Sequence, residues 1–147
     1  MAEEVVTGFR TEMFNPQVPV RIPVDGFING TRLTIVLLPT QHPRFHVNFV
    51  SQDDIVLHFN PRFDEDTVVN NSTLRGAWQA ENRLKQPLQP NRIYTVEFLS
   101  ESGKIIISIN GNQFCEFAER LPFQGVQQIE ISSGVFVHSV LITRYAA

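Results

Sequence analysis

The sequence predicts an all-β fold, a single antiparallel domain of the sandwich or barrel class. Short runs rich in Val, Ile, Thr, Phe and Tyr recur at a spacing of about 8–12 residues, which is typical of that class. Nine prolines and eight glycines punctuate the chain, and no window carries the i, i+3, i+4, i+7 apolar pattern of an amphipathic helix. At 147 residues the chain has the size of one compact domain.

Eight segments carry the strand pattern, with turn residues between them. In chain order they cover residues 32–38, 45–50, 55–63, 67–71, 94–99, 104–109, 128–132 and 136–143. Ser102-Gly103 and Asn110-Gly111 are expected to form tight hairpin turns, because glycine and asparagine accept the positive φ that such turns require. No linker, repeat or low-complexity tract divides the chain.

Composition excludes several classes of protein. With 12 Lys and Arg against 15 Asp and Glu, the formal net charge is −3, which does not suit an electrostatic nucleic-acid binder. A hydrophobic content of 42% excludes intrinsic disorder, and no apolar run approaches the ~18 residues that membrane insertion needs. The opening residues MAEEVVTGFR do not resemble a signal peptide, and Cys115 is the single cysteine. Both features favour synthesis in the reducing cytosol.

Alternation in two neighbouring segments gathers polar side chains on one face of the predicted sheet. In residues 55–63 we expect the core-facing side chains to be Ile55, Leu57, Phe59 and Phe63. The opposite face would then carry His58, Asn60 and Arg62. In the preceding segment we expect Phe45, Val47 and Phe49 to face the core, and Arg44, His46 and Asn48 to lie on the opposite face. A solvated sheet face also carries such polar residues. Asn60-Pro61 nevertheless favours a specific arrangement, because strands rarely tolerate proline away from an edge or bulge.

Three sequence blocks in this region stand at characteristic spacings. They are His58-Phe59-Asn60-Pro61-Arg62-Phe63, Val69-Asn70-Asn71, and Trp78 followed by Glu81-Asn82-Arg83. The series resembles the galectin signature H-x-N-P-R, V-x-N and W-x-x-E-x-R, and the resemblance runs from about Phe14 to the C-terminus. It implies a two-sheet jelly-roll β-sandwich of the galectin and concanavalin type. Residues 1–13 would form an N-terminal segment, and residues 14–147 would form a carbohydrate-recognition domain.

The resemblance implies a galactose site on a concave sheet face. His58, Asn60 and Arg62 would surround the axial 4-hydroxyl, and Trp78 would stack on the apolar face of the sugar. The residue types suit such a ligand independently, because hydroxyls need both donors and acceptors and the C–H face needs an aromatic platform. Leaving those polar groups unpaired is how the site would reject glucose.

The remaining motif residues are assigned by the same resemblance. Asn71 and Glu81 would bind the 6-hydroxyl, and Arg62, Glu81 and Arg83 would contact the neighbouring sugar. Trp78 and Glu81 are three residues apart, so both can face the sugar only if a bulge or break lies between them. Gln79 stands where galectins often have glycine.

An extended subsite is expected beside this core set. Asp64-Glu65-Asp66 forms a shorter acidic loop than in many galectins, and its Glu65 is expected to hold the neighbouring arginines or touch the second sugar. Arg44, His46 and Asn48 correspond to the strand that lines the extended groove of galectins. We expect them to contact whatever is attached beyond galactose.

Two alternatives to a lectin come from other functional classes. A β-sandwich glycoside hydrolase acting on galactosides would need a pair of carboxylates across the scissile bond, and Glu81 is the one firm carboxylate in the constellation. A sandwich that binds a protein partner would leave the His, Asn, Arg and Trp set unexplained. The acidic loop lacks the glycine and terminal glutamate of a calcium loop, so no metal site and no cofactor is expected.

The sequence therefore predicts a calcium-independent, non-catalytic lectin for β-galactosides such as lactose-type glycans. The expected partners are galactose-containing glycoconjugates, with no nucleic acid and no membrane insertion. The resemblance adds a homodimer that crosslinks its ligands. It also implies that the protein leaves the cytosol by a non-classical route, because galactosides are mostly extracellular.

Overall fold

The computed structural model describes residues 9–144, which contain fourteen strands and two short 3-10 helices. The strands are β1 Phe9–Phe14, β2 Val20–Pro23, β3 Thr31–Pro39, β4 Val47–Ser51, β5 Asp54–Arg62, β6 Thr67–Asn71, β7 Thr73–Leu74, β8 Ala77–Trp78, β9 Asn82–Lys85, β10 Tyr94–Glu101, β11 Lys104–Ile109, β12 Asn112–Ala118, β13 Gln128–Ile131 and β14 Val135–Arg144. The helices are η1 Phe63–Glu65 and η2 Phe123–Gly125. No helix within residues 9–144 is long and apolar enough to cross a membrane.

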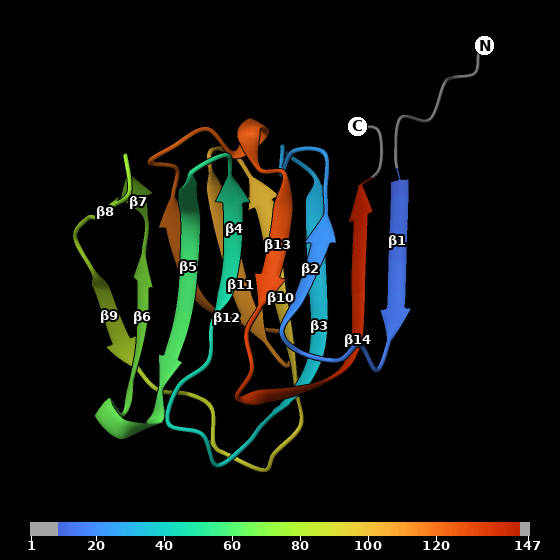
Figure 1. The fold of residues 1–147 in the computed structure, drawn as a ribbon, viewed down its shortest axis with the longest axis vertical. Helices are drawn as coiled ribbons and strands as arrows, with labels where there is room; N and C mark the ends of the chain where they lie inside the picture. The colour runs from blue at the N-terminus through green and yellow to red at the C-terminus, as the bar shows by residue number, and fades with distance from the viewer. Residues whose placement is uncertain (1–8, 145–147) are drawn as a thin grey trace.

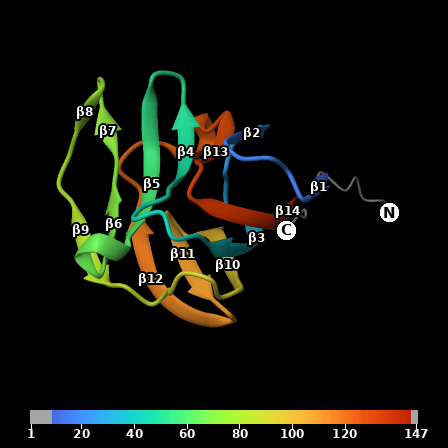
Figure 2. The same cartoon turned by 60° about the horizontal axis from the view of Figure 1, so that its bottom comes forward.

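Two six-stranded antiparallel sheets confirm the predicted sandwich. One sheet has the order β1-β14-β3-β10-β11-β12, and the other has the order β2-β13-β4-β5-β6-β9. Figure 2 shows them as two layers, with the β7-β8 hairpin extending beyond the second sheet. Strands distant in sequence are neighbours, as β1 and β14 are in Figure 1.

A phenylalanine cluster joins the two sheets. Phe98 of β10 packs edge-on against Phe49 of β4 and Phe59 of β5, with ring centroids 5.2 Å apart in both pairs. Phe27 completes the cluster at 4.8 Å from Phe49. All four side chains are fully buried, and edge-to-face packing of this kind adds about 0.5–1.5 kcal/mol per pair to the gain from burial. The core thus fixes β4 and β5, the strands that carry the polar set on their other face.

All eight predicted strands are present, within two residues of their expected ends. Both predicted hairpin turns also form, since Ser102-Gly103 and Asn110-Gly111 have positive φ. Strands β1, β2, β7, β8, β9 and β12 were not predicted. All six lie at sheet edges or in the small hairpin, where greater exposure weakens the alternation on which the prediction depends.

One predicted core position is wrong because of a β-bulge. The register between β4 and β5 shifts where Val50 pairs with Ile55 and Phe49 pairs with Leu57, so Val56 is the extra residue. Val56 is fully buried and Ile55 is not, because a bulge reverses the alternation on one side of it. Beyond the bulge Leu57 and Phe59 point inward as expected.

The N-terminal strand crosses the expected boundary at residue 14. Each residue of β1 pairs with β14, from Phe9 opposite Arg144 to Phe14 opposite Ser139. Residues 9–13 are therefore part of the β1-β14-β3-β10-β11-β12 sheet, while residues 1–8 lie outside the described part of the chain.

Candidate functional site

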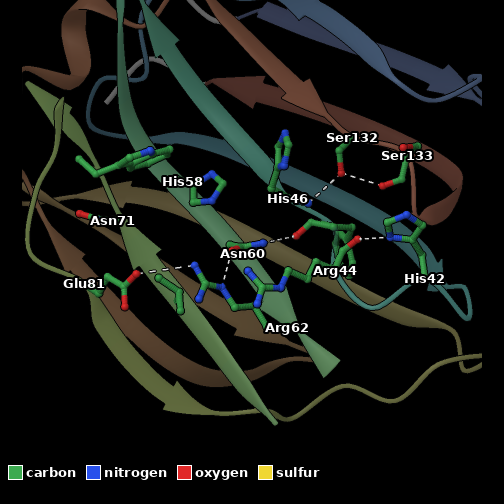
Figure 3. Close-up of a pocket in the computed structure, with 13 residues that line it drawn as sticks. His42, Arg44, His46, His58, Asn60, Arg62, Asn71, Glu81, Ser132 and Ser133 are labelled. Carbon is green, nitrogen blue, oxygen red and sulfur yellow. Dashed lines mark hydrogen bonds and ion pairs between the residues drawn. The ribbon is translucent and has the colours of Figure 1, made fainter. Parts of the chain in front are cut away.

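A depression of about 450 Å³ opens on the outer face of the β4-β5-β6 region. Figure 3 shows its polar side chains converging from these strands and from the loops beside them. The lining residues are His42, Arg44, Phe45, His46, His58, Asn60, Arg62, Val69, Asn71, Trp78, Glu81, Ser132 and Ser133.

The Asn60-Pro61 pair explains how the centre of the depression is held. Phe45 lies just before β4, beside the isolated bridge between Arg44 and Arg62, and its N–H donates to the Pro61 carbonyl at 3.3 Å. Proline has no N–H to return the bond, so the buried Phe45 carbonyl would lack a donor. The Asn60 side-chain amide supplies it, with Nδ2 2.8 Å from the Phe45 oxygen. The Asn60 amide thus takes the place of the main-chain N–H that Pro61 lacks, and this bond fixes the Asn60 side chain at the depression.

Arg62 is fixed by contacts on three sides. Its Nε donates to Asn60 Oδ1 at 2.8 Å, and its Nη1 donates to Glu65 Oε1 at 3.1 Å. Its Nη2 lies 3.6 Å from Glu81 Oε2. The side chain is 16% exposed, so this guanidinium presents donors to the depression in a single orientation.

His58 is held as a neutral ring. Burial, and next the charge of His46 nearby, lower the pKa of His58 to about 4. Its Nδ1 lies 2.6 Å from Asn48 Oδ1. An amide oxygen only accepts, so Nδ1 carries the proton and Nε2 remains an acceptor. Burial also lowers the pKa of His46, whose ring centroid is 5.2 Å from that of His58.

Trp78 lies beside His58 on the β7-β8 hairpin. The two ring centroids are 4.8 Å apart, and Trp78 is 53% exposed. Asp54 supports the hairpin, since it accepts hydrogen bonds from the Thr73 hydroxyl at 2.7 Å and from the Gly76 N–H at 3.0 Å. Strand pairing stops after Trp78 and resumes at Asn82. That is the break expected between Trp78 and Glu81, and both side chains line the depression.

Asn71 lies almost fully buried at the edge of the depression. Its Oδ1 accepts from the Ser72 N–H at 2.8 Å and from Arg120 Nη1 at 3.1 Å. Its Nδ2 donates to the Gln79 carbonyl at 3.0 Å. An amide has two N–H hydrogens and two acceptor positions. Asn71 therefore has one N–H left for a ligand and acts as a donor there.

An ionic rim borders the depression, made of Arg44, Asp64, Glu65, Glu81 and Arg83. Glu65 binds three guanidinium groups, those of Arg62 at 3.1 Å, Arg83 at 2.5 Å and Arg44 at 3.2 Å. The Arg62 and Arg83 guanidinium groups hold the pKa of Glu65 below its usual value.

The outer members of the rim are paired as well. Arg44 forms a bidentate ion pair with Asp64, in which Nε donates to Oδ1 at 3.1 Å and Nη2 donates to Oδ2 at 3.0 Å. This pairing lowers the pKa of Asp64. Arg83 binds Glu81 at 2.5 Å. Within residues 9–144 no group of three or more His, Cys, Asp or Glu side chains is placed to hold a metal ion.

The structure brings most of the predicted residues together. His58, Asn60, Arg62, Asn71, Trp78, Glu81, Arg44 and His46 line the depression, whereas Arg83, Glu65 and Asn48 do not. Arg83 and Glu65 stand behind Arg62 and Glu81 as their ion-pair partners. Asn48 is 5% exposed and contacts His58 instead of facing the opening.

Sequence reasoning missed His42, Ser132 and Ser133. Ser132 follows β13 and accepts a hydrogen bond from the His46 N–H at 2.8 Å. The His42 ring nitrogen Nδ1 lies 2.9 Å from the Arg44 carbonyl oxygen. The pairing of β13 with β4 brings the serines to this face, and no local pattern in the sequence indicates that pairing.

The centre of the depression complements a hydroxyl group. A hydroxyl donates one hydrogen bond and accepts two. His58 Nε2 offers one acceptor, while Asn60 Nδ2 and the Arg62 guanidinium offer donors. Trp78 adds an exposed aromatic surface next to them. The arrangement is suited to a neutral polyol that has one apolar face.

Comparison with known proteins also indicates a protein that binds sugars. Residues 17–142 match the family model described as galactoside-binding lectin. The crystal structure of the Caenorhabditis elegans galectin LEC-6 superposes with a TM-score of 0.87 at 58% identity, over 89% of this chain and 94% of that one. Human galectin-7 is 34% identical over 124 residues, covering 80% of this chain and 91% of its own length.

Human galectin-4 is 34% identical over 135 residues, which cover 86% of this chain and 42% of galectin-4. This chain thus spans less than half the length of that relative. The family match covers strands β2 to β13, most of β14 and every residue that lines the depression. The chain belongs to the galectin family of galactoside-binding lectins.

Proposed function

We propose that this protein is a lectin that binds β-galactosides in the depression on the β4-β5-β6 face. The observation that carries the proposal is the convergence of one acceptor, His58 Nε2, with donors from Asn60 and Arg62 beside Trp78. These groups satisfy one hydroxyl completely, and the indole covers the apolar C–H face of the same sugar.

The hydroxyl that fits this set is the axial 4-hydroxyl of galactose. In galactose the axial 4-hydroxyl projects from the ring face opposite the apolar face that the C–H bonds at C3, C4 and C5 form. A galactose that stacks this apolar face on Trp78 therefore directs its 4-hydroxyl away from the indole, and the β5 residues are the groups that would bind it. In glucose the 4-hydroxyl is equatorial, so it would leave Asn60 and Arg62 without a partner. An unpaired buried group costs about 1–3 kcal/mol, and this cost is the basis of discrimination.

Non-catalytic binding is supported by the state of the carboxylates. Glu65 is bound to three arginines, and both oxygens of Glu81 face guanidinium groups. A glycoside hydrolase needs one carboxyl group that holds a proton near neutral pH, and the low pKa of Glu65 does not suit that role. The same pairing supports calcium independence, because these oxygens already have cationic partners.

Each site is expected to bind weakly. A few hydrogen bonds of about 0.5–3 kcal/mol and one stacking contact correspond to a Kd between roughly 1 mM and 1 μM. Useful avidity would come from a homodimer that crosslinks glycoconjugates. Among residues 9–144, β1 is an edge strand with a partner strand on one side only, and such an edge is a suitable contact for a second copy. Sedimentation velocity and agglutination of galactose-coated beads test this part.

The proposed life cycle begins in the cytoplasm and continues outside the cell after non-classical secretion. It rests on the extracellular location of most galactosides. Detection of the protein in medium from cells whose classical secretion is blocked tests the route.

A glycan array tests the binding function. Wild-type protein should bind glycans that end in β-galactose, with and without EDTA. Trp78→Ala should lose that binding, Trp78→Phe should keep part of it, and Phe136→Ala should bind like wild type. Phe136 is the matched control because it is 59% exposed and lies on the other sheet. Retained binding by Trp78→Ala would refute the platform role, and release of free galactose would favour a hydrolase.

A further inference from the structure

Arg120 contacts the candidate site from outside it. It follows β12, the edge strand of the sheet that also contains β1 and β14, and is not among the residues that line the depression. Its Nη1 donates to Asn71 Oδ1 at 3.1 Å and to Ser72 Oγ at 3.2 Å, and its Nη2 donates to Asn82 Oδ1 at 3.3 Å. The guanidinium also lies over the Phe117 ring, 4.8 Å from its centroid. Arg120 therefore connects the far edge of one sheet to the ligand face of the other.

The contacts around Asn71 define which way its amide points. Two donors, the Ser72 N–H and Arg120, face Oδ1, and one acceptor, the Gln79 carbonyl, faces Nδ2. Turning the amide over would set N–H against N–H and oxygen against oxygen at all three contacts. The buried amide would then have no partner, at a cost of about 1–3 kcal/mol.

We propose that Arg120 is a positioning residue that makes Asn71 a hydrogen-bond donor to the ligand. The inference rests on the proposed galactoside function, in which Asn71 and Glu81 bind the 6-hydroxyl. Arg120 donates into the amide, the amide donates its free N–H to the hydroxyl, and the hydroxyl donates to the Glu81 carboxylate. Each bond in such a chain polarises the next, and the chain runs from a cation to an anion.

The arrangement predicts a selective effect on one hydroxyl. The Ser72 N–H and the Gln79 carbonyl still hold the amide when Arg120 is removed, so the effect is moderate. The 4-hydroxyl set on β5 has no contact with Arg120 in the described residues. Loss of Arg120 should thus weaken recognition of the 6-hydroxyl and leave the rest of the sugar contacts unchanged.

The experiment compares methyl β-galactoside with its 6-deoxy analogue by calorimetry. Wild-type protein should prefer the 6-hydroxyl compound. In Arg120→Met, which keeps the aliphatic stem over Phe117, that preference should fall about fivefold, as expected for loss of one hydrogen bond. The Kd for the 6-deoxy compound should stay within about twofold of wild type. Arg32→Met is the matched control, since it removes an arginine paired with Glu97 on the other sheet.

Each other outcome contradicts a defined statement. An unchanged preference in Arg120→Met overturns the inference, and so does an equal loss for both compounds, which would indicate general damage to the fold. If wild type binds both compounds equally, Asn71 does not read the 6-hydroxyl and the inference fails, although galactoside binding stands. If wild type binds neither, the proposed function fails first. The side-chain amide resonances of Asn71 supply a second readout, and they should shift in Arg120→Met and not in Arg32→Met.

Discussion

The floor of the depression and its ionic rim are held in place by different forces. The floor, made of His58, Asn60 and Asn71, lies on β5 and β6, and each side chain forms a hydrogen bond with a neutral amide or carbonyl oxygen. Asn60 and Asn71 each accept a further hydrogen bond from an arginine. The rim comes from η1, β9 and the residues that precede β4 and β9, and it is held by ion pairs between partly exposed side chains. Arg62 belongs to both, since it binds Asn60 on one side and Glu65 on the other.

This difference suggests that the floor sets the affinity for galactose and that the rim sets the preference for the second sugar. Floor groups are buried, so an unpaired one is costly and a matching hydroxyl gains the full benefit. Exposed ion pairs contribute about 0–1 kcal/mol and are screened by salt. We therefore expect the floor to decide whether galactose binds and the rim to adjust the response to the second sugar.

Asn60→Ala should break the floor and give the largest effect. The substitution removes the ligand contacts of Asn60 and leaves both the Phe45 carbonyl and Arg62 Nε without their partners. Lactose affinity should fall at least about 100-fold, near 3 kcal/mol. Calorimetry measures it, with Asn112→Ala on the other sheet as the control. A loss below about threefold would contradict the central role of Asn60.

Pro61→Ala tests whether the missing main-chain N–H of proline is what holds the Asn60 side chain in place. Alanine restores a main-chain N–H opposite the Phe45 carbonyl, and this N–H competes with the Asn60 amide for the same oxygen. Lactose affinity should fall about fivefold, since roughly one hydrogen bond loses its constraint. Thermal unfolding should stay close to wild type, or rise, because the ladder bond replaces the side-chain bond. Unchanged affinity would show that Asn60 is held without help from Pro61.

Glu65→Gln tests the rim. The neutral amide weakens the contacts to Arg62, Arg83 and Arg44, so affinity for lactose should fall about threefold, while affinity for methyl β-galactoside changes less. The difference should shrink at 0.5 M salt, because screening already weakens these pairs in wild type. Asp66→Asn, whose parent carboxylate pairs with Lys85, is the control. Equal losses for both ligands would place Glu65 in the floor.

The smallest expected effect is that of pH between 8 and 6. His58 has a pKa of about 4, so it stays a neutral acceptor there and lactose affinity should be constant, falling only as the pH nears 4. Folding stability follows the same group. His58 becomes protonated near pH 6.5 in the unfolded chain and near pH 4 in the folded chain. The free energy of unfolding therefore decreases as the pH falls from about 6.5 to about 4. A loss of affinity centred near pH 6.5 would contradict a neutral, buried His58.

The sequence predicts regular strands better than edges. Period-two alternation located β5 and placed His58, Asn60 and Arg62 on one face, because each residue type repeats the same choice between core and solvent. The bulge at Val56 depends on register with β4, and register involves a partner strand that no local pattern names. The short β1 and β2 strands are defined mainly by pairing with β14 and β13.

The same limit applies to the site. Motif spacing predicted the residues that face the depression, and the three-residue separation of Trp78 and Glu81 predicted the break. It did not predict that Asn48 would face His58 from within the sheet. Arg120 lies 49 residues after Asn71 and follows β12 of the other sheet, so only the three-dimensional structure reveals the contact.

Lactose and cellobiose differ in the configuration of one carbon, C4 of the non-reducing sugar, and so test the 4-hydroxyl claim directly. Both disaccharides are titrated into the same ¹⁵N-labelled protein. Lactose should bind with a Kd between roughly 1 mM and 1 μM and shift the resonances of His58, Asn60 and Arg62. Cellobiose should bind at least about 100-fold more weakly. Equal affinity for the two sugars, or shifts confined to other residues, would contradict the assignment of His58, Asn60 and Arg62 to an axial 4-hydroxyl.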